Sequence, residues 1–101
     1  MSYVVVIDPG HGGEEFHGGE TGPYVEKDIN LIVSNAMKTY LEQFDYVTVY
    51  MTRYGDDPVD LKARCDFAKS VNADLFVSIH FNMSALHDKY GAEVWIPAQK
   101  S

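Results

Sequence analysis

The stretch VVVIDPGH, residues 4–11, determines how the rest of the chain folds. Its run of β-branched apolar residues predicts a strand over residues 3–8 that is buried on both faces, as in a parallel sheet covered by helices. An Asp-Pro-Gly turn then ends the strand, and His11 follows at once. A second apolar run, LFVSI at 75–79, leads directly into His80 in the same way. Two such strands in one sheet would bring both histidines to its carboxyl edge.

The segments between these two strands alternate between helical and strand patterns. Alternation predicts a strand over 46–53, Asp60 is placed to cap a second helix that runs to about residue 71, and a short strand is expected over 93–96. The order predicts an α/β fold, with a mainly parallel, twisted sheet flanked by helices. Since the chain stops soon after the last strand, this sheet reads as truncated at the C-terminus. A helix is predicted from Glu26, with an apolar stripe at three- and four-residue spacing that comprises Ile29, Val33, Ala36, Met37, Tyr40, Leu41 and Phe44.

Length and composition point to one small domain over residues 1–101 and exclude some function classes. A net charge of −7 without any cluster of Lys or Arg argues against a nucleic-acid partner. No run is long enough to span a membrane, and no signal peptide precedes the first strand, which leaves cytoplasmic synthesis with release, or export by other means.

The single cysteine, Cys65, cannot form an internal disulfide and is expected to be buried in the second helix, where Leu61 and Ala68 share its helical spacing.

A glycine-rich loop over residues 9–23 separates the first strand from the first helix, and Glu26 stands where the loop gives way to that helix. If the helix returns antiparallel to the strand, Glu26 faces the same sheet edge as His11 and His80. Two imidazoles and one carboxylate are protein ligands of a hydrolytic zinc site, with a fourth position open for water. Spacing alone leaves a second interpretation open: a turn histidine, a core histidine and a helix acid favoured by the macrodipole.

Neighbouring residues extend this candidate site. Asp8 and Asn82 are close enough to fix a ring tautomer or to hold a substrate carbonyl, although Asp8 could equally cap the turn. His17 and His87 lie in loops and are not expected to be ligands. The glycine-rich loop lacks the Lys-Ser/Thr ending of a P-loop, so a nucleotide or phosphate site is not favoured.

Four sequence blocks carry a resemblance to a known family. VIDPGHGG at 6–13, EKDINL at 26–31, MTR at 51–53 and ADLFVSIHFN at 73–82 resemble the zinc-dependent N-acetylmuramoyl-L-alanine amidases of the amidase-3 type, in the same order and over nearly the whole chain. The resemblance implies that residues 1–101 are the N-terminal portion of an amidase catalytic domain.

The same resemblance implies a reaction and a cofactor. The reaction is hydrolysis of the amide between N-acetylmuramic acid and L-alanine in peptidoglycan, as in the cell-wall lysis or remodelling carried out by autolysins and endolysins. The cofactor is Zn²⁺, and its ligands correspond to His11, Glu26 and His80.

The family's domain continues to a late glutamate that acts as general base, and this chain has no counterpart. Glu14, Glu15 or Glu20 could substitute, but no spacing favours one of them. A general base typically contributes a factor of about 10²–10⁴ to the rate. The alternative function is therefore a non-catalytic zinc- or wall-binding module. A truncated sheet would also expose an apolar face and an unpaired edge, which predicts self-association of the chain beside its binding to peptidoglycan.

Overall fold

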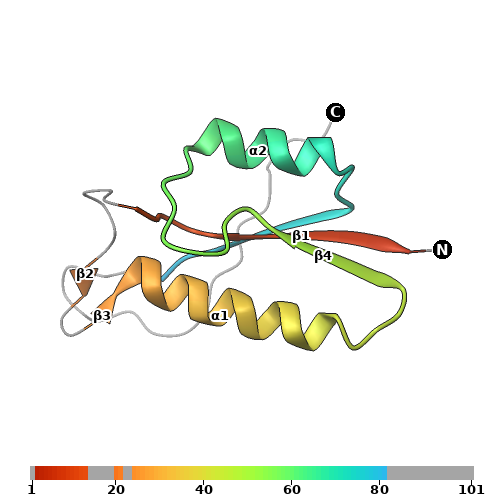
Figure 1. Cartoon of the computed structure of the whole chain (residues 1–101), viewed down its shortest axis with the longest axis horizontal. Helices are drawn as coiled ribbons and strands as arrows, with labels where there is room; N and C mark the ends of the chain where they lie inside the picture. Colours follow the sequence, from red (N-terminus) through yellow and green to blue (C-terminus); the bar gives the residue numbers. More distant parts are fainter. Residues whose placement is uncertain (1, 14–19, 22–23, 82–101) are drawn as a thin grey trace.

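The structure, a computed structural model, describes residues 2–13, 20–21 and 24–81 (Figure 1). The predicted helices and strands of this part are confirmed to within a few residues, whereas the short hairpin of β2 and β3 lies where a loop was predicted. The strand predicted over 93–96 lies outside the described residues. In chain order the elements are β1 (Tyr3–Pro9), β2 (Glu20–Thr21), β3 (Tyr24–Val25), α1 (Glu26–Leu41), β4 (Val47–Met51), α2 (Leu61–Ser70) and β5 (Leu75–Ile79).

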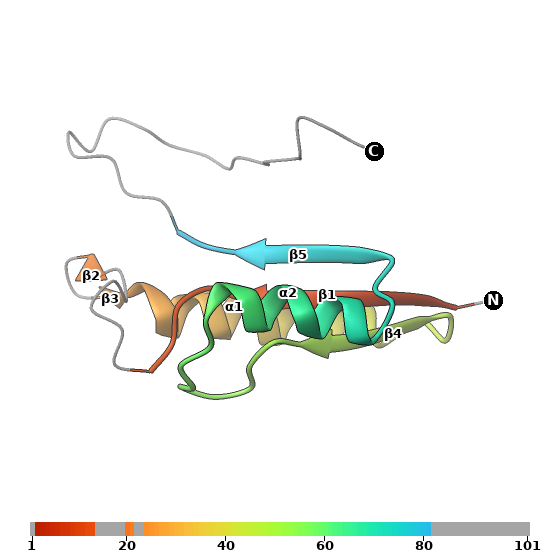
Figure 2. The same cartoon turned by 90° about the horizontal axis from the view of Figure 1, so that it is seen from above.

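Strand β1 is the centre of a parallel sheet with the order β4-β1-β5. Val5 of β1 pairs with Val49 of β4 on one side and with Leu75 of β5 on the other. All three strands run in the same direction (Figure 2). β1 has a neighbour on each side and a helix over each face, so its apolar run is buried from Val5 onward. The predicted parallel α/β fold is therefore confirmed.

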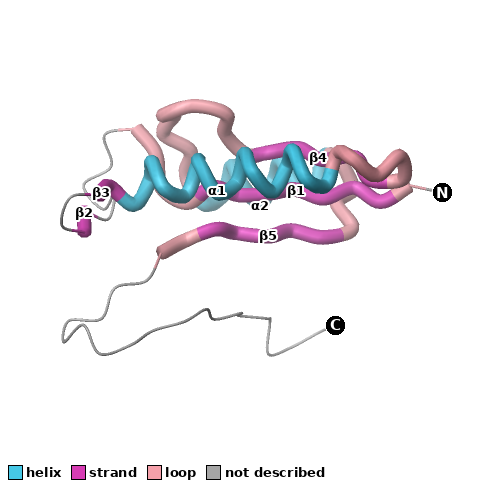
Figure 3. The backbone as a smooth tube through the Cα atoms, turned by 90° about the horizontal axis from the view of Figure 1, so that it is seen from below, coloured by secondary structure: helices cyan, strands magenta, loops and turns pink. Residues whose placement is uncertain are grey.

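The two helices lie on opposite sides of the sheet (Figure 1). α1 covers β1 and β4, and β5 lies beside the helix with less cover when the molecule is viewed from the α1 side (Figure 3). The apolar core is small and sits between α1 and this part of the sheet. Its buried members are Val5, Ile7, Val49 and Met51, against which Leu31, Met37, Leu41, Val47 and Ile79 pack.

Both helices turn polar residues toward the interior. α1 buries Glu26, Asn30 and Ser34 at four-residue spacing, while Tyr40 of the predicted apolar stripe is 60% exposed. α2 buries Arg64, and Cys65, which was predicted to be buried, is exposed. Apolar periodicity thus located both helices, and Met37 and Leu41 of the predicted stripe pack against the core, but the pattern did not predict the buried polar positions. Asn30 of α1 and Arg64 of α2 are turned inward because they donate hydrogen bonds to the turn that follows β1.

A buried ion pair connects β1 to α2 and to both neighbouring strands. Oδ1 of Asp8 accepts hydrogen bonds from Nη1 of Arg64 and from Oγ1 of Thr52, each at 2.6 Å. Oδ2 of Asp8 accepts from Oγ of Ser78 at 2.8 Å. A buried charge pair is tolerated when its hydrogen-bonding capacity is used in this way. One carboxylate therefore links the ends of three strands to the second helix.

Replacing Arg64 with alanine is expected to lower the free energy of unfolding by about 3–5 kcal/mol, because the carboxylate of Asp8 would stay buried without its counter-charge. Lys62→Ala is the control, since it lies on the same helix with a side chain that is 85% exposed and should leave stability nearly unchanged. Urea denaturation followed by far-ultraviolet circular dichroism measures both. Small effects of similar size in the two variants would contradict this role of the ion pair.

Candidate metal centre

His11, Glu26 and His80 come together at the carboxyl edge of the sheet. His11 follows β1, His80 follows β5, and Glu26 is the first residue of α1. One ligand atom from each side chain lies within 4.8 Å of the others. Nε2 of His11 is 3.6 Å from Oε1 of Glu26, and Nδ1 of His80 is 3.2 Å from Oε2 of the same carboxylate. Each of the three residues lies at the end of a strand or the start of a helix, and these ends meet at one edge of the sheet.

The donor atoms of this cluster fit a small divalent ion of the zinc type. Zinc binds imidazole nitrogen and carboxylate oxygen at about 2.0–2.1 Å, which puts neighbouring ligand atoms of a tetrahedral site about 3.4 Å apart. The 3.6 Å from Nε2 of His11 to Oε1 of Glu26 is close to this spacing, and the 3.2 Å from Nδ1 of His80 is measured to the other carboxylate oxygen, Oε2. The two imidazole rings stand nearly perpendicular, at 88°, with centroids 5.0 Å apart. Glu26 is only 8% exposed, and its carboxylate lies close to both imidazole rings. A glutamate that served only to interact with the helix dipole would need neither feature.

Two buried arginines hold the turn that carries His11. Arg64 donates from Nη2 to the carbonyl of His11 at 2.8 Å and from Nη1 to that of Pro9 at 2.7 Å. Arg53 donates from Nε to the carbonyl of Pro9 at 3.0 Å and from Nη2 to that of Gly10 at 2.8 Å. Burial, and then the nearby charge of Arg64, lower the pKa of Arg53. His11 has a left-handed backbone with φ of 62°, which these bonds help to maintain.

Arg53 also ties this turn to the first turn of α1. Its Nη2 donates to the carbonyl of Lys27 at 2.9 Å, one residue beyond Glu26. Arg53 belongs to the MTR block at 51–53, and its position in the sequence alone does not predict this role. A signal was nevertheless present, since an arginine directly after a strand at the functional edge of a parallel sheet is well placed to bond exposed carbonyls.

A second set of hydrogen bonds connects Gly13, in the segment after β1, to Lys27 in the first turn of α1 and to Asp56. The amide of Gly13 donates to Oδ1 of Asp56 at 2.8 Å, and Nζ of Lys27 donates both to the carbonyl of Gly13 and to the Asp56 carboxylate. The hydrogen bond from Lys27, followed by that from Gly13, lowers the pKa of Asp56. The stabilising effect of this carboxylate is therefore fully present above its ordinary pKa and is lost as the pH falls through the lowered value.

The other predicted site residues are placed differently. Oδ1 of Asp8 accepts from Arg64 and Thr52, and Oδ2 accepts from Ser78. Arg64 connects Asp8 to His11, because it also donates to the carbonyl of His11. The role predicted for Asp8 at the metal stays a prediction. Asn82, His17, His87, Glu14 and Glu15 lie outside the described residues.

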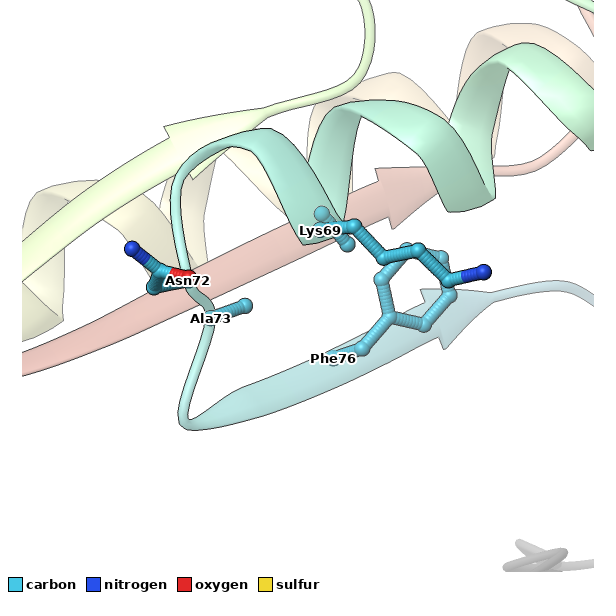
Figure 4. A pocket seen from close by; sticks show the side chains of 5 residues that line it. Lys69, Asn72, Ala73 and Phe76 are labelled. Carbon is cyan, nitrogen blue, oxygen red and sulfur yellow. The ribbon is translucent and has the colours of Figure 1, made fainter.

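A groove between α2 and β5 lies away from the cluster. It has a volume of about 380 Å³, and the Phe76 ring extends along it (Figure 4). It is formed at the C-terminal end of α2 and the amino end of β5, whereas His80 follows the carboxyl end of β5. The groove is therefore separate from the candidate metal centre. Its lining residues are Ala68, Lys69, Asn72, Ala73 and Phe76.

Comparison with known proteins gives a consistent result. A family model described as N-acetylmuramoyl-L-alanine amidase matches residues 5–101. The N-acetylmuramoyl-L-alanine amidase AmiC of Escherichia coli O6:H1 is 36% identical over 99 residues, which cover 96% of this chain and 23% of AmiC.

Two solved structures are similar to this chain in both fold and sequence. The catalytic domain of CwlV, an N-acetylmuramoyl-L-alanine amidase from Bacillus (Paenibacillus) polymyxa var. colistinus, has a TM-score of 0.77 and 37% identity, covering 82% of this chain and 47% of that one. The CwlD amidase of Clostridioides difficile, solved with the GerS lipoprotein, has a TM-score of 0.80 and 28% identity, covering 89% and 53%. The chain thus spans about half the length of these two solved chains.

Gly10 offers a direct test of the geometry around the cluster. A Cβ atom at Gly10 would lie 2.2 Å from Cε1 of His80. The backbone of Gly10 is held on both sides, because its amide donates a hydrogen bond to the carbonyl of Ile79 and its own carbonyl accepts from Asn30 and Arg53. The imidazole would therefore have to move. We expect Gly10→Ala to weaken zinc binding about ten-fold or more, the scale found when groups that orient ligands are lost.

Gly55→Ala is the matched control, because a Cβ there would meet only Oδ2 of Asp57 at an ordinary 3.6 Å. Competition with a chromophoric chelator measures the zinc dissociation constant of each variant. If Gly10→Ala bound zinc as tightly as Gly55→Ala and the parent chain, the position of His80 over Gly10 would not matter for the metal.

Proposed function

The chain belongs to the N-acetylmuramoyl-L-alanine amidase family, and from this premise we propose that it functions in the zinc-dependent hydrolysis of the amide between N-acetylmuramic acid and L-alanine in peptidoglycan. In this proposal residues 1–101 are the metal-binding, N-terminal portion of the catalytic domain. The observation that carries the proposal is the cluster of His11, Glu26 and His80, whose ligand atoms lie within 4.8 Å of one another.

In this proposal the metal would supply the chemistry, and the surrounding residues orient its carboxylate ligand. Zinc held by two imidazoles and a carboxylate would supply Lewis acidity, lowering the pKa of a water and polarising an amide carbonyl. The chain's own groups set the orientation of the carboxylate. The backbone amide of Phe81 donates to Oε2 of Glu26 at 2.9 Å, and the Oε1 atom faces His11. Glu26 is thereby held between the two segments that carry the histidines.

One observation favours a second candidate, a non-catalytic zinc- or wall-binding module. Within residues 2–13, 20–21 and 24–81, Glu26 is the only carboxylate in the cluster, and Asp8 is engaged by Arg64. A group that accepts a proton during hydrolysis would then come from elsewhere. Without that group the chain would bind zinc or wall peptide without turnover.

Peptidoglycan is the proposed binding partner, and the bacterial cell wall is the proposed place of action, in lysis or remodelling. Of the helices that the structure describes, none has the length and apolar character needed to cross a membrane. The net charge of −7 is compatible with a substrate other than nucleic acid.

Zinc content and hydrolysis together distinguish the two candidates. We expect the purified chain to bind one zinc ion and both His11→Ala and His80→Ala to bind it far more weakly, with His87→Ala as a control of the same residue type. Release of peptide from purified peptidoglycan is followed as new free amino groups of L-alanine. Release that a chelator stops and zinc restores supports the hydrolase, and zinc binding without release supports the module. A parent chain that binds no zinc would contradict the hydrolase and the zinc-binding form of the module.

We further propose that the chain self-associates through β5, with a second copy as the partner. β5 forms an edge of the described sheet, and its residues Leu75 and Phe76 are 55% and 39% exposed. An exposed strand edge with apolar side chains favours pairing with another chain.

Sedimentation equilibrium tests this proposal. The average mass is expected to rise above 11.4 kDa with concentration, and Leu75→Lys should suppress the rise. Leu61→Lys is the control, because Leu61 is an exposed leucine on α2, away from the strand edge. A monomer at every concentration, or equal effects of the two substitutions, would count against pairing through β5.

A further inference from the structure

The inward face of α1 is polar where a packing face would be apolar. Glu26, Asn30 and Ser34 lie one turn apart, and all three are buried. Among the described residues, Oδ1 of Asn30 and Oγ of Ser34 are buried side-chain oxygens without a hydrogen-bond partner. Such atoms lower stability, because they lose water and gain no bond in return. If either position served packing alone, an apolar side chain there would make the chain more stable.

The amide nitrogen of Asn30 makes two contacts that bear on the proposed metal site. Nδ2 donates to the carbonyl of Gly10 at 3.1 Å and, over a longer 3.4 Å, to Oε2 of Glu26. Gly10 directly precedes His11, and Glu26 is one helical turn before Asn30. A single amide group therefore lies between the turn that carries one proposed ligand and the carboxylate of another.

We propose that Asn30 is a positioning residue, which orients the Glu26 carboxylate relative to the His11 turn before the metal binds. The inference rests on the zinc site proposed above. An amide nitrogen suits this place because it can donate to two acceptors at once, whereas a carboxylate there would repel Glu26. A glutamate side chain has several rotatable bonds, and fixing them in advance reduces the ordering that metal binding would otherwise require.

Other donors make this role separable from a contribution to stability. The carbonyl of Gly10 also accepts from Nη2 of Arg53 at 2.8 Å, and Oε2 of Glu26 also accepts from the amide of Phe81 at 2.9 Å. Replacing Asn30 with leucine, which also branches at Cγ, therefore leaves neither acceptor unpaired and removes the unpaired Oδ1 atom. The chain should remain as stable as before or become more stable, while its affinity for zinc falls.

The experiment compares Asn30→Leu with Asn30→Ala and with Ser34→Ala. Ser34→Ala is the matched control, since it removes the other unpaired oxygen from the same helix face without touching Gly10 or Glu26. Three quantities are measured on each chain: the zinc dissociation constant, the thermal midpoint of the metal-free form, and the visible absorption bands of the Co²⁺-substituted form, which report the arrangement of the ligands.

We expect both Asn30 variants to bind zinc about ten-fold more weakly and to show altered Co²⁺ bands. Ser34→Ala should match the parent in both respects, and the thermal midpoint of Asn30→Leu should not fall. Zinc affinities within two-fold of the parent, or losses that follow the thermal midpoint across all three variants, would overturn the inference while leaving the zinc site in place. Failure of both Asn30 variants to fold would also overturn it, because Asn30 would then be required for stability. A parent chain that binds no zinc overturns the metal site and the inference together.

Discussion

The structure depends on how the buried turn after β1 satisfies its backbone carbonyls. The carbonyl oxygens of Pro9, Gly10 and His11 need hydrogen-bond donors where no further strand residue supplies them. Arg53, two residues beyond β4, and Arg64, from α2, provide most of these donors. Asn30 of α1 provides another. Segments from both faces of the sheet therefore converge on one turn, and that turn carries His11.

This constraint explains why the apolar core is small while the polar network is extensive. The buried apolar cluster is confined to β1 and β4, with residues of α1 packed against it. α2 instead turns Arg64 inward, where it pairs with Asp8 and bonds to the turn. Charged groups of this kind contribute little net stability when they are paired, but removing one partner is costly. They also place side chains more strictly than apolar packing does, and a cluster of metal ligands requires such placement.

Much of the fold could be predicted from sequence, because a buried parallel strand has a distinct pattern. The apolar runs before His11 and His80 located β1 and β5, and the rule that sites lie at the carboxyl edge of such a sheet brought the two histidines and Glu26 together. Asp60 caps α2 as expected, since its side chain accepts from the amide of Ala63 at 2.8 Å.

The inward faces of the helices could not be predicted in the same way. Hydrophobic periodicity reports only where apolar side chains recur. Which face of each helix points inward also depends on side-chain donors that bond to carbonyl groups of a turn distant in sequence. Asn30 and Arg64 are therefore buried, and Tyr40 and Cys65 are exposed. Arg53 was missed for the same reason, because its importance depends on which carbonyls the fold brings within its reach.

We propose that His11, Glu26 and His80 together hold one zinc ion. Zinc K-edge X-ray absorption on the metal-loaded chain tests it most directly, because the spectrum identifies the atoms bound to the ion. We expect nitrogen and oxygen neighbours at about 2.0–2.1 Å with the outer-shell signal of two imidazoles. A sulfur neighbour at about 2.3 Å, which only the thiolate of Cys65 or a methionine could supply, or a shell without imidazole, would contradict it.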